Sequence, residues 1–393
     1  MEEVVIVSAA RTPIGSFGGS LKNCNAVELG KTATEAALNR AGLSPDEVDS
    51  VIFGNVLQAG IGQNTARQIA VAAGIPYEKT AMTINEVCGS GLKAIILASQ
   101  AIRLGDARTV VVGGTESMSQ APYLLPNQRW GSKLGDINTI DSLVHDGLTD
   151  AFDQQHMGIT AETVAERFQV SREEQDAFAL HSQQKAAAAQ AAGYFNQEIA
   201  PIILIDRKNQ QKVVAEDEYI RKDATIESLG KLRPAFQKNG TVTAGNASGI
   251  NDGAAALVLM SKSEAEAKGV PYLATIKGYA ETGINPAIMG YAPYYAIKQV
   301  LSKTGLLADD IDLFELNEAF ASQSIAVIRD LGLPEEKINI SGGAIALGHP
   351  IGASGSRILV TLLHALERTD TKLGLASLCI GGGMGIAMIV ERP

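Results

Sequence analysis

A cysteine and a histidine each stand where a strand is expected to give way to a helix. Cys88 lies in residues 85–91 (Asn-Glu-Val-Cys-Gly-Ser-Gly), whose glycines would let a substrate approach the backbone. A thiol at a helix N-terminus feels the positive end of the helix dipole, which should lower its pKa and favour the nucleophilic thiolate. A lone cysteine is as commonly a small buried hydrophobe, so the position alone leaves both interpretations open.

His349 lies in residues 341–352 (Ser-Gly-Gly-Ala-Ile-Ala-Leu-Gly-His-Pro-Ile-Gly), where a strand is predicted to end and a helix to begin. Together with Cys88 it would supply a nucleophile and a general base, the minimum set for acyl transfer. The alternative for such a segment is a phosphate-binding loop. No Gly-Lys-Ser/Thr follows it, however, and the G-x-G-x-x-G spacing is absent, which disfavours a dinucleotide-binding fold.

Cys379 and Asn317 stand at two further junctions. Cys379 shortly precedes three consecutive glycines, residues 381–383, whose N–H groups are able to face an oxyanion. The alternative is a tight hairpin with a buried thiol. Asn317 follows a predicted strand, and an asparagine at that position most often caps the next helix.

These residues must be positioned by alternating strands and helices. We expect helices at 28–40, 65–73 and 89–104, and strands at 4–9, 51–56, 80–85, 109–112, 254–260, 273–279, 312–316 and 386–390. This alternation predicts an α/β domain with a mostly parallel sheet. The helix at 89–104 is apolar nearly all round, which predicts a buried position.

The last third of the chain repeats the first part. Residues 41–49 and 304–312 each end a helix at a glycine, form an acidic turn and enter a strand, and the helix after Gly91 corresponds to the helix after Gly355 at nearly the same interval. Two matches in the same order predict a duplicated half. A pseudo-twofold axis between the halves would bring Cys88 and His349 to one central region.

The repeat is interrupted between residues 117 and 249. We therefore expect an N-terminal half made of residues 1–116 and 250–270, an inserted domain at 117–249, and a C-terminal half at 271–393. The insertion contains a helical region at 161–192 with a capping box at Ser171, and the basic residues Arg207, Lys208 and Arg221. Long insertions in compact folds are often binding elements.

Composition excludes several classes of protein. Hydrophobic residues make up 46% of the chain, which excludes intrinsic disorder, and 33 basic against 43 acidic residues give a net charge of −10, which disfavours nucleic-acid binding. Three scattered cysteines make neither a disulfide framework nor a zinc site. The N-terminus does not resemble a signal peptide, and we expect no membrane-spanning stretch. A cytoplasmic location is therefore expected.

Five motifs together resemble the thiolase family, in order and over essentially the whole chain: residues 8–15, 87–91, 317–320, 348–350 and 379–383. The match is closest to the short-chain acetyl-CoA acetyltransferase type, in which residues 155–158 would belong to the acyl pocket. The resemblance implies the thiolase fold: two duplicated mixed-sheet α/β halves in a layered αβαβα arrangement, with an inserted loop domain.

The resemblance also implies a reaction, the reversible Claisen condensation of two acetyl-CoA to acetoacetyl-CoA and CoA. Cys88 would become the acyl-enzyme while His349 takes its proton, and Cys379 would remove the α-proton of the second acetyl-CoA. The enolate oxygen would be held by His349 and a water fixed by Asn317. The tetrahedral intermediate would sit on the N–H groups of Cys88 and Gly381. No metal or redox cofactor is implied, because coenzyme A is itself substrate and product.

Binding residues follow from the same resemblance. Arg221 would hold the CoA phosphates, although an ordinary solvated surface is the alternative for this residue. The pantetheine would lie along Leu148, Ser228, Phe236, Ala244 and Ser248, and a small acyl pocket would be shaped by His156, Met157, Ala319 and Phe320. A homotetramer is implied, with residues 122–139 as a predicted contact.

Three alternatives to this activity remain. The first is a degradative 3-ketoacyl-CoA thiolase of broader chain length, which would use the same residues. A ketoacyl synthase is disfavoured because that chemistry usually lacks a second cysteine base. A non-catalytic acyl-lipid carrier is disfavoured by the intact Cys88, His349 and Cys379. We also hypothesise that the two cysteines form a disulfide on oxidation if their Cα atoms lie within about 7 Å.

Overall fold

A single sheet runs through the molecule and joins two similar halves. The computed structural model describes residues 2–205 and 208–393, so Arg207 of the basic pair lies outside the described residues. In spatial order the main strands are β12 (Leu313–Leu316), β13 (Leu373–Ile380), β14 (Met384–Glu391), β11 (Ala274–Gly283), β1 (Val4–Arg11), β10 (Asn251–Ser261), β5 (Thr109–Ser117), β3 (Ser50–Gly54) and β4 (Thr80–Ile84), with the short β2 (Gly15–Ser16) paired to β10. The halves meet where β1 pairs with β11 over only Val5↔Thr275 and Ile6↔Ala274.

The sheet is mixed, whereas the alternation of elements had predicted a mostly parallel one. β3 is parallel to β4 and β5, and β12 is parallel to β13. β10 and β14, however, each run antiparallel to both of their neighbours. Each half therefore has a parallel outer part and an antiparallel inner part, in agreement with the mixed-sheet halves that the family resemblance implies.

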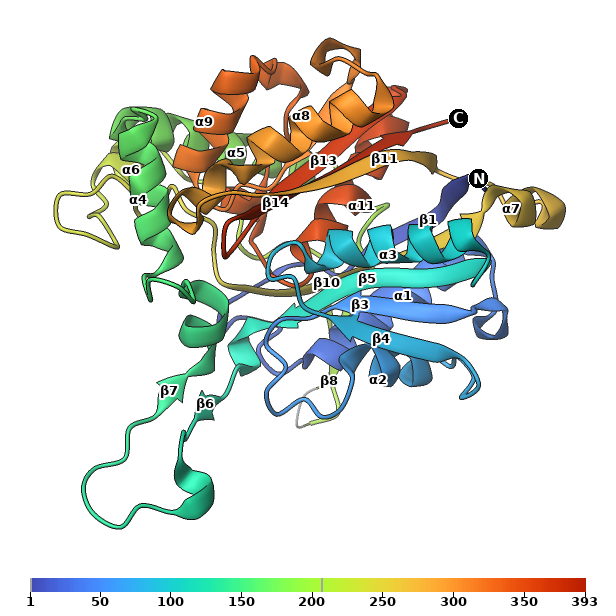
Figure 1. Cartoon of the computed structure of the whole chain (residues 1–393), viewed down its shortest axis with the longest axis horizontal. Coiled ribbons are helices and arrows are strands. Elements are labelled where there is room, and N and C mark those ends of the chain that lie inside the picture. The colour runs from blue at the N-terminus through green and yellow to red at the C-terminus, as the bar shows by residue number, and fades with distance from the viewer. Residues whose placement is uncertain (1, 206–207) are drawn as a thin grey trace.

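Helices complete five layers (Figure 1). α1 (Ala26–Ala41) and α2 (Thr65–Ala72) cover the outer face of the N-terminal strands, and α8 (Ala292–Thr304) and α9 (Ala321–Leu331) cover that of the C-terminal strands. α3 (Ser90–Leu104) and α11 (Ser354–Thr369) lie between the two sets of strands and share one hydrophobic core with both. The layered αβαβα arrangement is therefore present.

The duplication is visible element by element. α1 and α8 end at the left-handed glycines Gly42 and Gly305, each is followed by a 3₁₀ turn, and then comes β3 or β12. α3 and α11 follow, each leading into the strand β5 or β13. The counterpart of β4 is reduced to one parallel bridge between Phe314 and Ile338. The strand expected to end before Ser341 is therefore not a regular strand.

The central helix α3 corrects one expectation from the sequence. Residues Val87–Leu104 are long and apolar enough to cross a membrane by length and composition alone, although no such stretch was expected. In the structure, Leu92, Ile95 and Ile96 of this helix are fully buried against α11 and the strands on either side. Its apolar faces are required by a position inside the protein, between the strands of the two halves.

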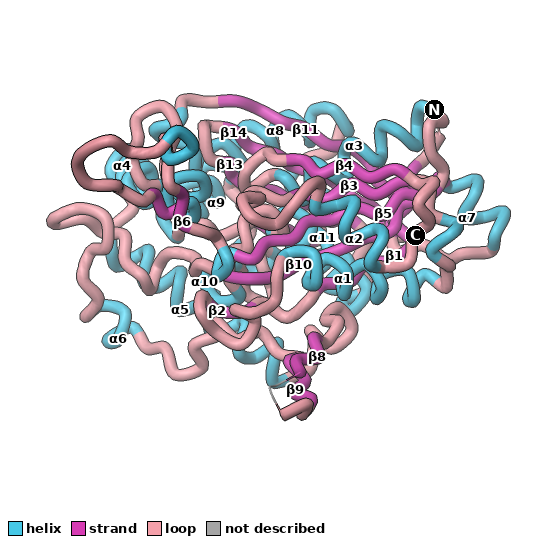
Figure 2. Tube along the Cα trace, turned by 90° about the horizontal axis from the view of Figure 1, so that it is seen from below, coloured by secondary structure: helices cyan, strands magenta, loops and turns pink. Residues whose placement is uncertain are grey.

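The insertion carries the remaining strands and α-helices apart from α7 (Lys262–Lys268) and α10 (Ala344–Leu347). They are β6 (Tyr123–Leu124), β7 (Ile140–Asp141), α4 (Met157–Arg167), α5 (Arg172–Ala191), β8 (Ile202–Ile205), β9 (Gln211–Val214) and α6 (Ile226–Gly230). The capping box predicted at the start of α5 is confirmed, because Ser171 and Glu174 bond reciprocally. The loop between β6 and β7 projects from the body (Figure 1), and the β8–β9 hairpin projects in Figure 2.

Candidate active site

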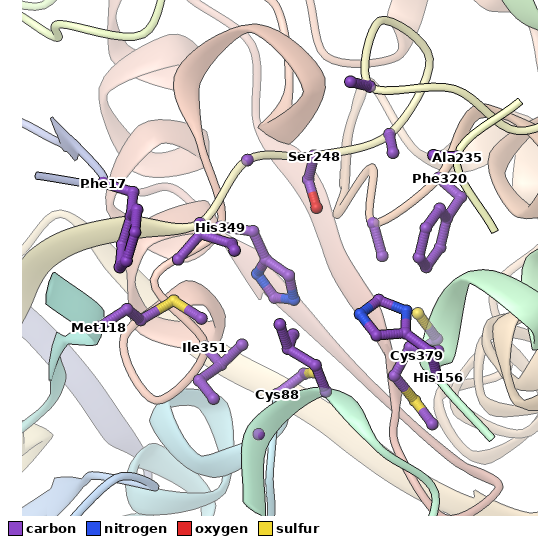
Figure 3. Close-up of a pocket in the computed structure, with 18 of the residues that line it drawn as sticks. Phe17, Cys88, Met118, His156, Ala235, Ser248, Phe320, His349, Ile351 and Cys379 are labelled. Carbon is purple, nitrogen blue, oxygen red and sulfur yellow. The ribbon is translucent and has the colours of Figure 1, made fainter. Parts of the chain in front are cut away.

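One cavity of about 420 Å³ lies where the two halves meet the insertion, and Cys88, His349 and Cys379 all line it (Figure 3). Cys88 follows β4 and precedes α3, His349 precedes α11, and Cys379 lies near the end of β13. The repeat thus places the equivalent junctions before α3 and α11 at one cavity, as the sequence predicted.

Cys88 is held in a tight turn between β4 and α3. Ser90 Oγ accepts from Glu86 N at 2.8 Å and donates to the Val87 carbonyl at 2.7 Å. Burial raises the pKa of the Cys88 thiol to about 11, although the N–H groups of Gly381 and of Cys88 itself act in the opposite direction. The lowered pKa predicted from the helix N-terminus is therefore wrong, because the loss of water around the sulfur outweighs these dipoles.

His349 is buried and neutral. Its Nδ1 lies 2.5 Å from Ser354 Oγ, and Ser354 Oγ also lies 2.9 Å from the Pro350 carbonyl oxygen. If the single hydroxyl proton goes to that carbonyl, Nδ1–H donates to Ser354 and Nε2 carries a lone pair. Nε2 has no hydrogen-bond partner among the described residues. Burial, with a smaller effect of Arg357, lowers the pKa of His349 to about 4.

Asn317 lies behind His349. Its Nδ2 is 3.5 Å from His349 Nδ1, and the side chain is buried without lining the cavity. The interpretation of Asn317 as a helix cap is wrong, since α9 begins only at Ala321 and its N-cap is Phe320. Asn317 instead directly follows the last residue of β12, and its N–H donates to the Ser377 carbonyl on β13 at 3.0 Å.

Cys379 and Gly381 lie at the turn from β13 to β14. Cys379 is 1% exposed, and burial raises the pKa of its thiol, with the nearby Cys88 adding to the effect. A Cβ placed on Gly381 would lie 3.3 Å from Val87 Cγ1, so this backbone passes close beside the Cys88 turn. The site thus brings together two thiols, a neutral imidazole and two N–H donors, a set suited to thioester chemistry.

Comparison with known proteins identifies the family. Residues 4–263 match "Thiolase, N-terminal domain" and residues 270–392 match "Thiolase, C-terminal domain". The chain belongs to the thiolase family. It is 56% identical to an acetyl-CoA acetyltransferase of Chromobacterium violaceum over 391 residues, which covers 100% of both chains.

Solved structures confirm the thiolase fold. The crystal structure of the Bacillus anthracis acetyl-CoA acetyltransferase matches with a TM-score of 0.98 and 46% identity, covering 100% of this chain and 99% of that chain. Human mitochondrial 3-ketoacyl-CoA thiolase in complex with CoA matches with a TM-score of 0.96 and 48% identity, covering 100% and 98%.

Most of the binding residues expected from the sequence line the cavity of this thiolase. They are Leu148, His156, Met157, Phe236, Ala244, Ser248, Ala319 and Phe320. Arg221 and Ser228 do not line it and instead border a separate surface depression. Arg221 is nevertheless linked to the cavity, because its guanidinium donates to the hydroxyl of the cavity-lining Tyr219 at 3.2 Å.

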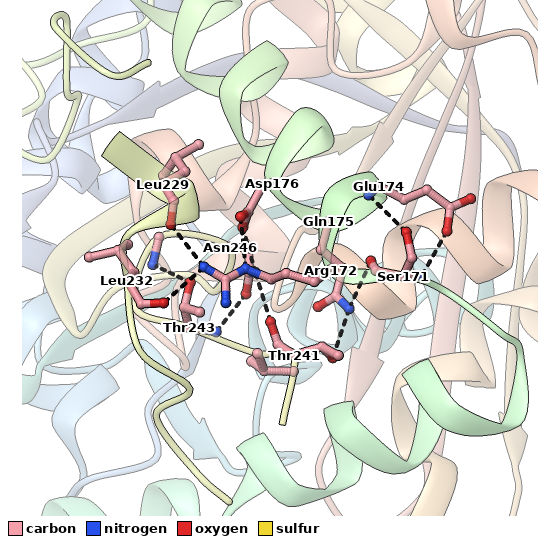
Figure 4. A network of polar contacts seen from close by, with 12 residues as sticks. Ser171, Arg172, Glu174, Gln175, Asp176, Leu229, Leu232, Thr241, Thr243 and Asn246 are labelled. Atoms are coloured by element: carbon pink, nitrogen blue, oxygen red, sulfur yellow. Dashed lines mark hydrogen bonds and ion pairs between the residues drawn. The ribbon is translucent and has the colours of Figure 1, made fainter. Parts of the chain in front are cut away.

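A polar network holds the cavity wall formed by residues 244–248 (Figure 4). Asn246 Nδ2 donates to Asp176 Oδ1 on α5 at 2.9 Å, and Asn246 Oδ1 accepts from Thr243 N at 2.7 Å. Arg172 binds the same Asp176 at 2.7 Å. Because Ser248 N also donates to the Ala319 carbonyl at 2.9 Å, this wall is attached to both the insertion and the C-terminal half.

Sequence reasoning missed several residues of the site. Phe17, Met118, Met289 and Ile351 line the cavity, and they offered no signal beyond lying near motifs or in apolar runs. The buried Glu116 was also missed. Its carboxylate accepts from Asn55 Nδ2 and from Gly352 N, both at 2.8 Å, and so joins the N-terminal half to the loop that follows His349. Burial raises the pKa of Glu116 to about 7.

Proposed function

We propose that this thiolase is an acetyl-CoA C-acetyltransferase that reversibly condenses two acetyl-CoA to acetoacetyl-CoA and CoA. The observation that carries the proposal is the meeting of Cys88, His349 and Cys379 at one apolar cavity. Full-length relatives named acetyl-CoA acetyltransferase support it, and the human relative crystallised with CoA supports acyl-CoA as the substrate class.

In the first half-reaction, His349 Nε2 takes the proton of Cys88 as the sulfur attacks the acetyl-CoA carbonyl carbon. The negative charge that develops on the carbonyl oxygen is bound by the N–H groups of Cys88 and Gly381. The carbon–sulfur bond to coenzyme A then breaks, and the CoA thiolate receives the proton from His349. Because imidazole and thiol both begin neutral, no separated charges need be maintained in the buried resting site.

The raised pKa of Cys379 makes its resting form a thiol. In the second half-reaction, Cys379 first gives its thiol proton to His349 Nε2, and the resulting thiolate removes a methyl proton from the second acetyl-CoA. The protonated Nε2 of His349, and a water held by Asn317, would donate to the enolate oxygen. The enolate carbon attacks the acetyl group on Cys88, a carbon–carbon bond forms, and the Cys88 sulfur leaves as a thiolate that takes the proton from His349, so Cys379 ends as a thiol. That form is the starting state for the reverse direction, in which Cys379 protonates the departing enolate.

A short acyl chain fits the apolar end of the cavity. Met157, Met289, Phe320 and Cys379 form one buried cluster there, with Phe236 packed against it. Phe236 meets the edge of Phe320 at a centroid distance of 6.2 Å and stacks on His156 at 4.8 Å. We expect these side chains to limit the room for a longer acyl chain.

A second candidate is a 3-ketoacyl-CoA thiolase of broader chain length, favoured by the similarity to the human enzyme of that name. A panel of 3-ketoacyl-CoA substrates assayed for thiolysis separates the two. We expect the highest kcat/KM with acetoacetyl-CoA and a steep fall with length. Equal turnover of a long-chain substrate would instead establish the broader activity.

Covalent trapping tests the catalytic assignment. After incubation with acetyl-CoA and an acid quench, peptide mass mapping should find the acetyl group on Cys88 and not on Cys24 or Cys379. Cys88→Ser should lose nearly all turnover, since a serine hydroxyl is far less acidic and less nucleophilic here. Acetylation of Cys379 alone would reverse the assignment of the two cysteines.

We also propose four properties of the protein that do not follow from the catalytic chemistry. The first is binding of CoA along the insertion, with Arg221 at the phosphates and Ser228 by the pantetheine. The second is a homotetramer with contacts through residues 122–139, where Trp130 and Leu134 are 90% and 96% exposed. The third is a cytoplasmic location. The fourth is the division into 1–116 with 250–270, 117–249 and 271–393.

A further inference from the structure

Gln323 is a buried amide on α9 to which neither the sequence motifs nor the proposed reaction assigns a role. It is 2% exposed. A Cβ placed on Gly290 would lie 2.7 Å from Gln323 Cβ, so the chain opposite packs directly against the base of this side chain. The position of the amide is thus closely confined.

The surroundings of the amide determine its orientation. One orientation satisfies Asn317 and Ser324: the nitrogen donates to the Asn317 carbonyl oxygen at 3.2 Å, and the oxygen accepts from Ser324 N at 2.7 Å and from Ser324 Oγ at 3.0 Å. The opposite orientation would place the amide oxygen against the Asn317 carbonyl oxygen, two acceptors with no proton between them.

In the satisfied orientation, the amide nitrogen is the atom that lies 3.4 Å from Cys379 Sγ. An amide nitrogen has two protons, one for the Asn317 carbonyl and one for the sulfur. In the part of the chain that the structure describes, this is the one side-chain hydrogen-bond contact to Cys379. Cys379 shares a buried apolar cluster with Met157, Met289, Ala319 and Phe320, which offer no proton.

We propose that Gln323 donates a hydrogen bond to the Cys379 thiolate and thereby stabilises the charged form of the base that removes the methyl proton of acetyl-CoA. The proposal rests on the function proposed above for Cys379. A thiolate in an apolar cluster has lost its water, and a fixed donor replaces part of that solvation. The second amide proton of Gln323 is donated to the backbone carbonyl of Asn317, whose side chain contacts His349. Gln323 thus links Cys379 to the residue beside His349.

This role affects one half-reaction only. Proton removal by Cys379 depends on the fraction of thiolate, which a donor increases. Acetylation of Cys88 uses His349 as its base and the N–H groups of Cys88 and Gly381, and no hydrogen bond joins Gln323 to any of these. Loss of the amide should therefore impair methyl-proton exchange and condensation while leaving acetyl transfer to Cys88 intact.

The first experiment measures the thiolate of Cys379 directly. In a Cys24→Ala/Cys88→Ser background, Cys379 is the remaining cysteine, and its alkylation rate by iodoacetamide at pH values below the thiol pKa is proportional to the thiolate fraction. Gln323→Leu should slow alkylation by about tenfold or more at each pH, as expected for the loss of a hydrogen bond to a charged group. An unchanged rate would overturn the proposal.

The second experiment compares half-reactions in the otherwise wild-type protein. Gln323→Leu should lower deuterium exchange of the acetyl-CoA methyl protons by about tenfold or more, with Cys88 acetylated at the wild-type rate. An equal loss in both half-reactions would indicate a structural role only and would overturn the proposal. Gln323→Met, which is unbranched and of similar length, provides the same comparison if the leucine variant does not fold.

Gln175 on α5 offers a matched control, since it is a fully buried amide that donates to Thr241 (Figure 4) and not to Cys379. In the same Cys24→Ala/Cys88→Ser background, Gln175→Leu should leave the alkylation rate of Cys379 unchanged. If the wild-type protein failed to acetylate Cys88, the proposed function would be wrong, whereas the alkylation experiment would still decide whether Gln323 stabilises the Cys379 thiolate.

Discussion

Nδ1 of His349 lies 2.5 Å from the hydroxyl oxygen of Ser354, the first residue of α11. The hydrogen bond on one imidazole nitrogen decides which nitrogen is free to act as a base. We therefore expect Ser354→Ala to lower kcat by roughly tenfold or more, in both acetyl transfer and condensation, because His349 takes part in each.

Ser356 provides the control for that substitution. It lies in the same first turn, is fully buried, and donates to the Ala353 carbonyl at 2.8 Å without touching His349. Ser356→Ala should keep kcat near wild type. If both variants lost activity equally, helix packing rather than orientation of the imidazole would explain the result.

The pH dependence of acetyl transfer should reflect a neutral pair. Burial lowers the pKa of His349 to about 4 and raises the pKa of Cys88 to about 11. Between these values the thiol stays protonated and the imidazole stays unprotonated. Rapid-quench acetylation of Cys88 should accordingly be nearly flat from about pH 6 to pH 9, where ordinary histidine and cysteine titrate. A sigmoid centred near pH 6.5 or 8.5 would contradict the neutral pair.

Cys379→Ala should separate the two half-reactions. The substitution removes a base but leaves Cys88, His349 and the N–H donors in place, so acetyl mass should still appear on Cys88. Condensation and methyl exchange should both fall by at least the 10²–10⁴-fold typical of a lost general base. Condensation at a near wild-type rate, or a folded variant that does not acetylate, would refute this division of labour. His349→Ala is the comparison variant and should impair both half-reactions.

Asn246→Ala should act on substrate binding through the cavity wall. The asparagine joins Asp176 to the backbone of Thr243, and its removal leaves buried polar atoms unpaired. We expect the free energy of unfolding to fall by about 1–3 kcal/mol and KM for acetyl-CoA to rise more than kcat falls. Denaturant melts and steady-state kinetics measure these effects. Asn39→Ala, on an exposed face of α1, should change neither.

Oxidation should link the two catalytic cysteines. Cys88 and Cys379 line one cavity, and the charge of one affects the pKa of the other. In a Cys24→Ala background, mild oxidant should inhibit slowly, because neutral thiols are poor nucleophiles, and thiol reductant should restore activity. Peptide mapping should find a Cys88–Cys379 disulfide, and irreversible loss without that link would exclude it.

Much of the fold followed from local pattern. Glycines ended α1 and α8 where expected, the capping box started α5, and the all-apolar α3 proved to be buried. The pattern failed at Gly113 and Gly114, since the strand predicted at 109–112 continues through both glycines to Ser117. A Cβ on Gly114 would lie 2.1 Å from the Gly352 carbonyl oxygen, so this glycine serves a contact between halves that no local rule describes.

The candidate site, too, could be predicted from the sequence only in part. Residue type and junction position indicated Cys88 and His349, because nucleophile and base are local chemical properties. The pKa of Cys88 was misjudged, since burial depends on what other segments place around the sulfur. The roles of Glu116 and Ser354 likewise depend on partners brought together by folding: Gly352 lies far from Glu116 in the sequence, and the bond of Ser354 to His349 needs a particular loop conformation.

The duplicated architecture has an evolutionary consequence. A symmetric dimer of identical half-chains would present two equivalent junctions before its central helices, and both would have to carry the same side chain. A thiol at one junction and an imidazole at the other require two copies that are free to diverge. Two halves within one polypeptide, paired where β1 meets β11, are free of that constraint, so a nearly symmetric architecture can hold asymmetric chemistry.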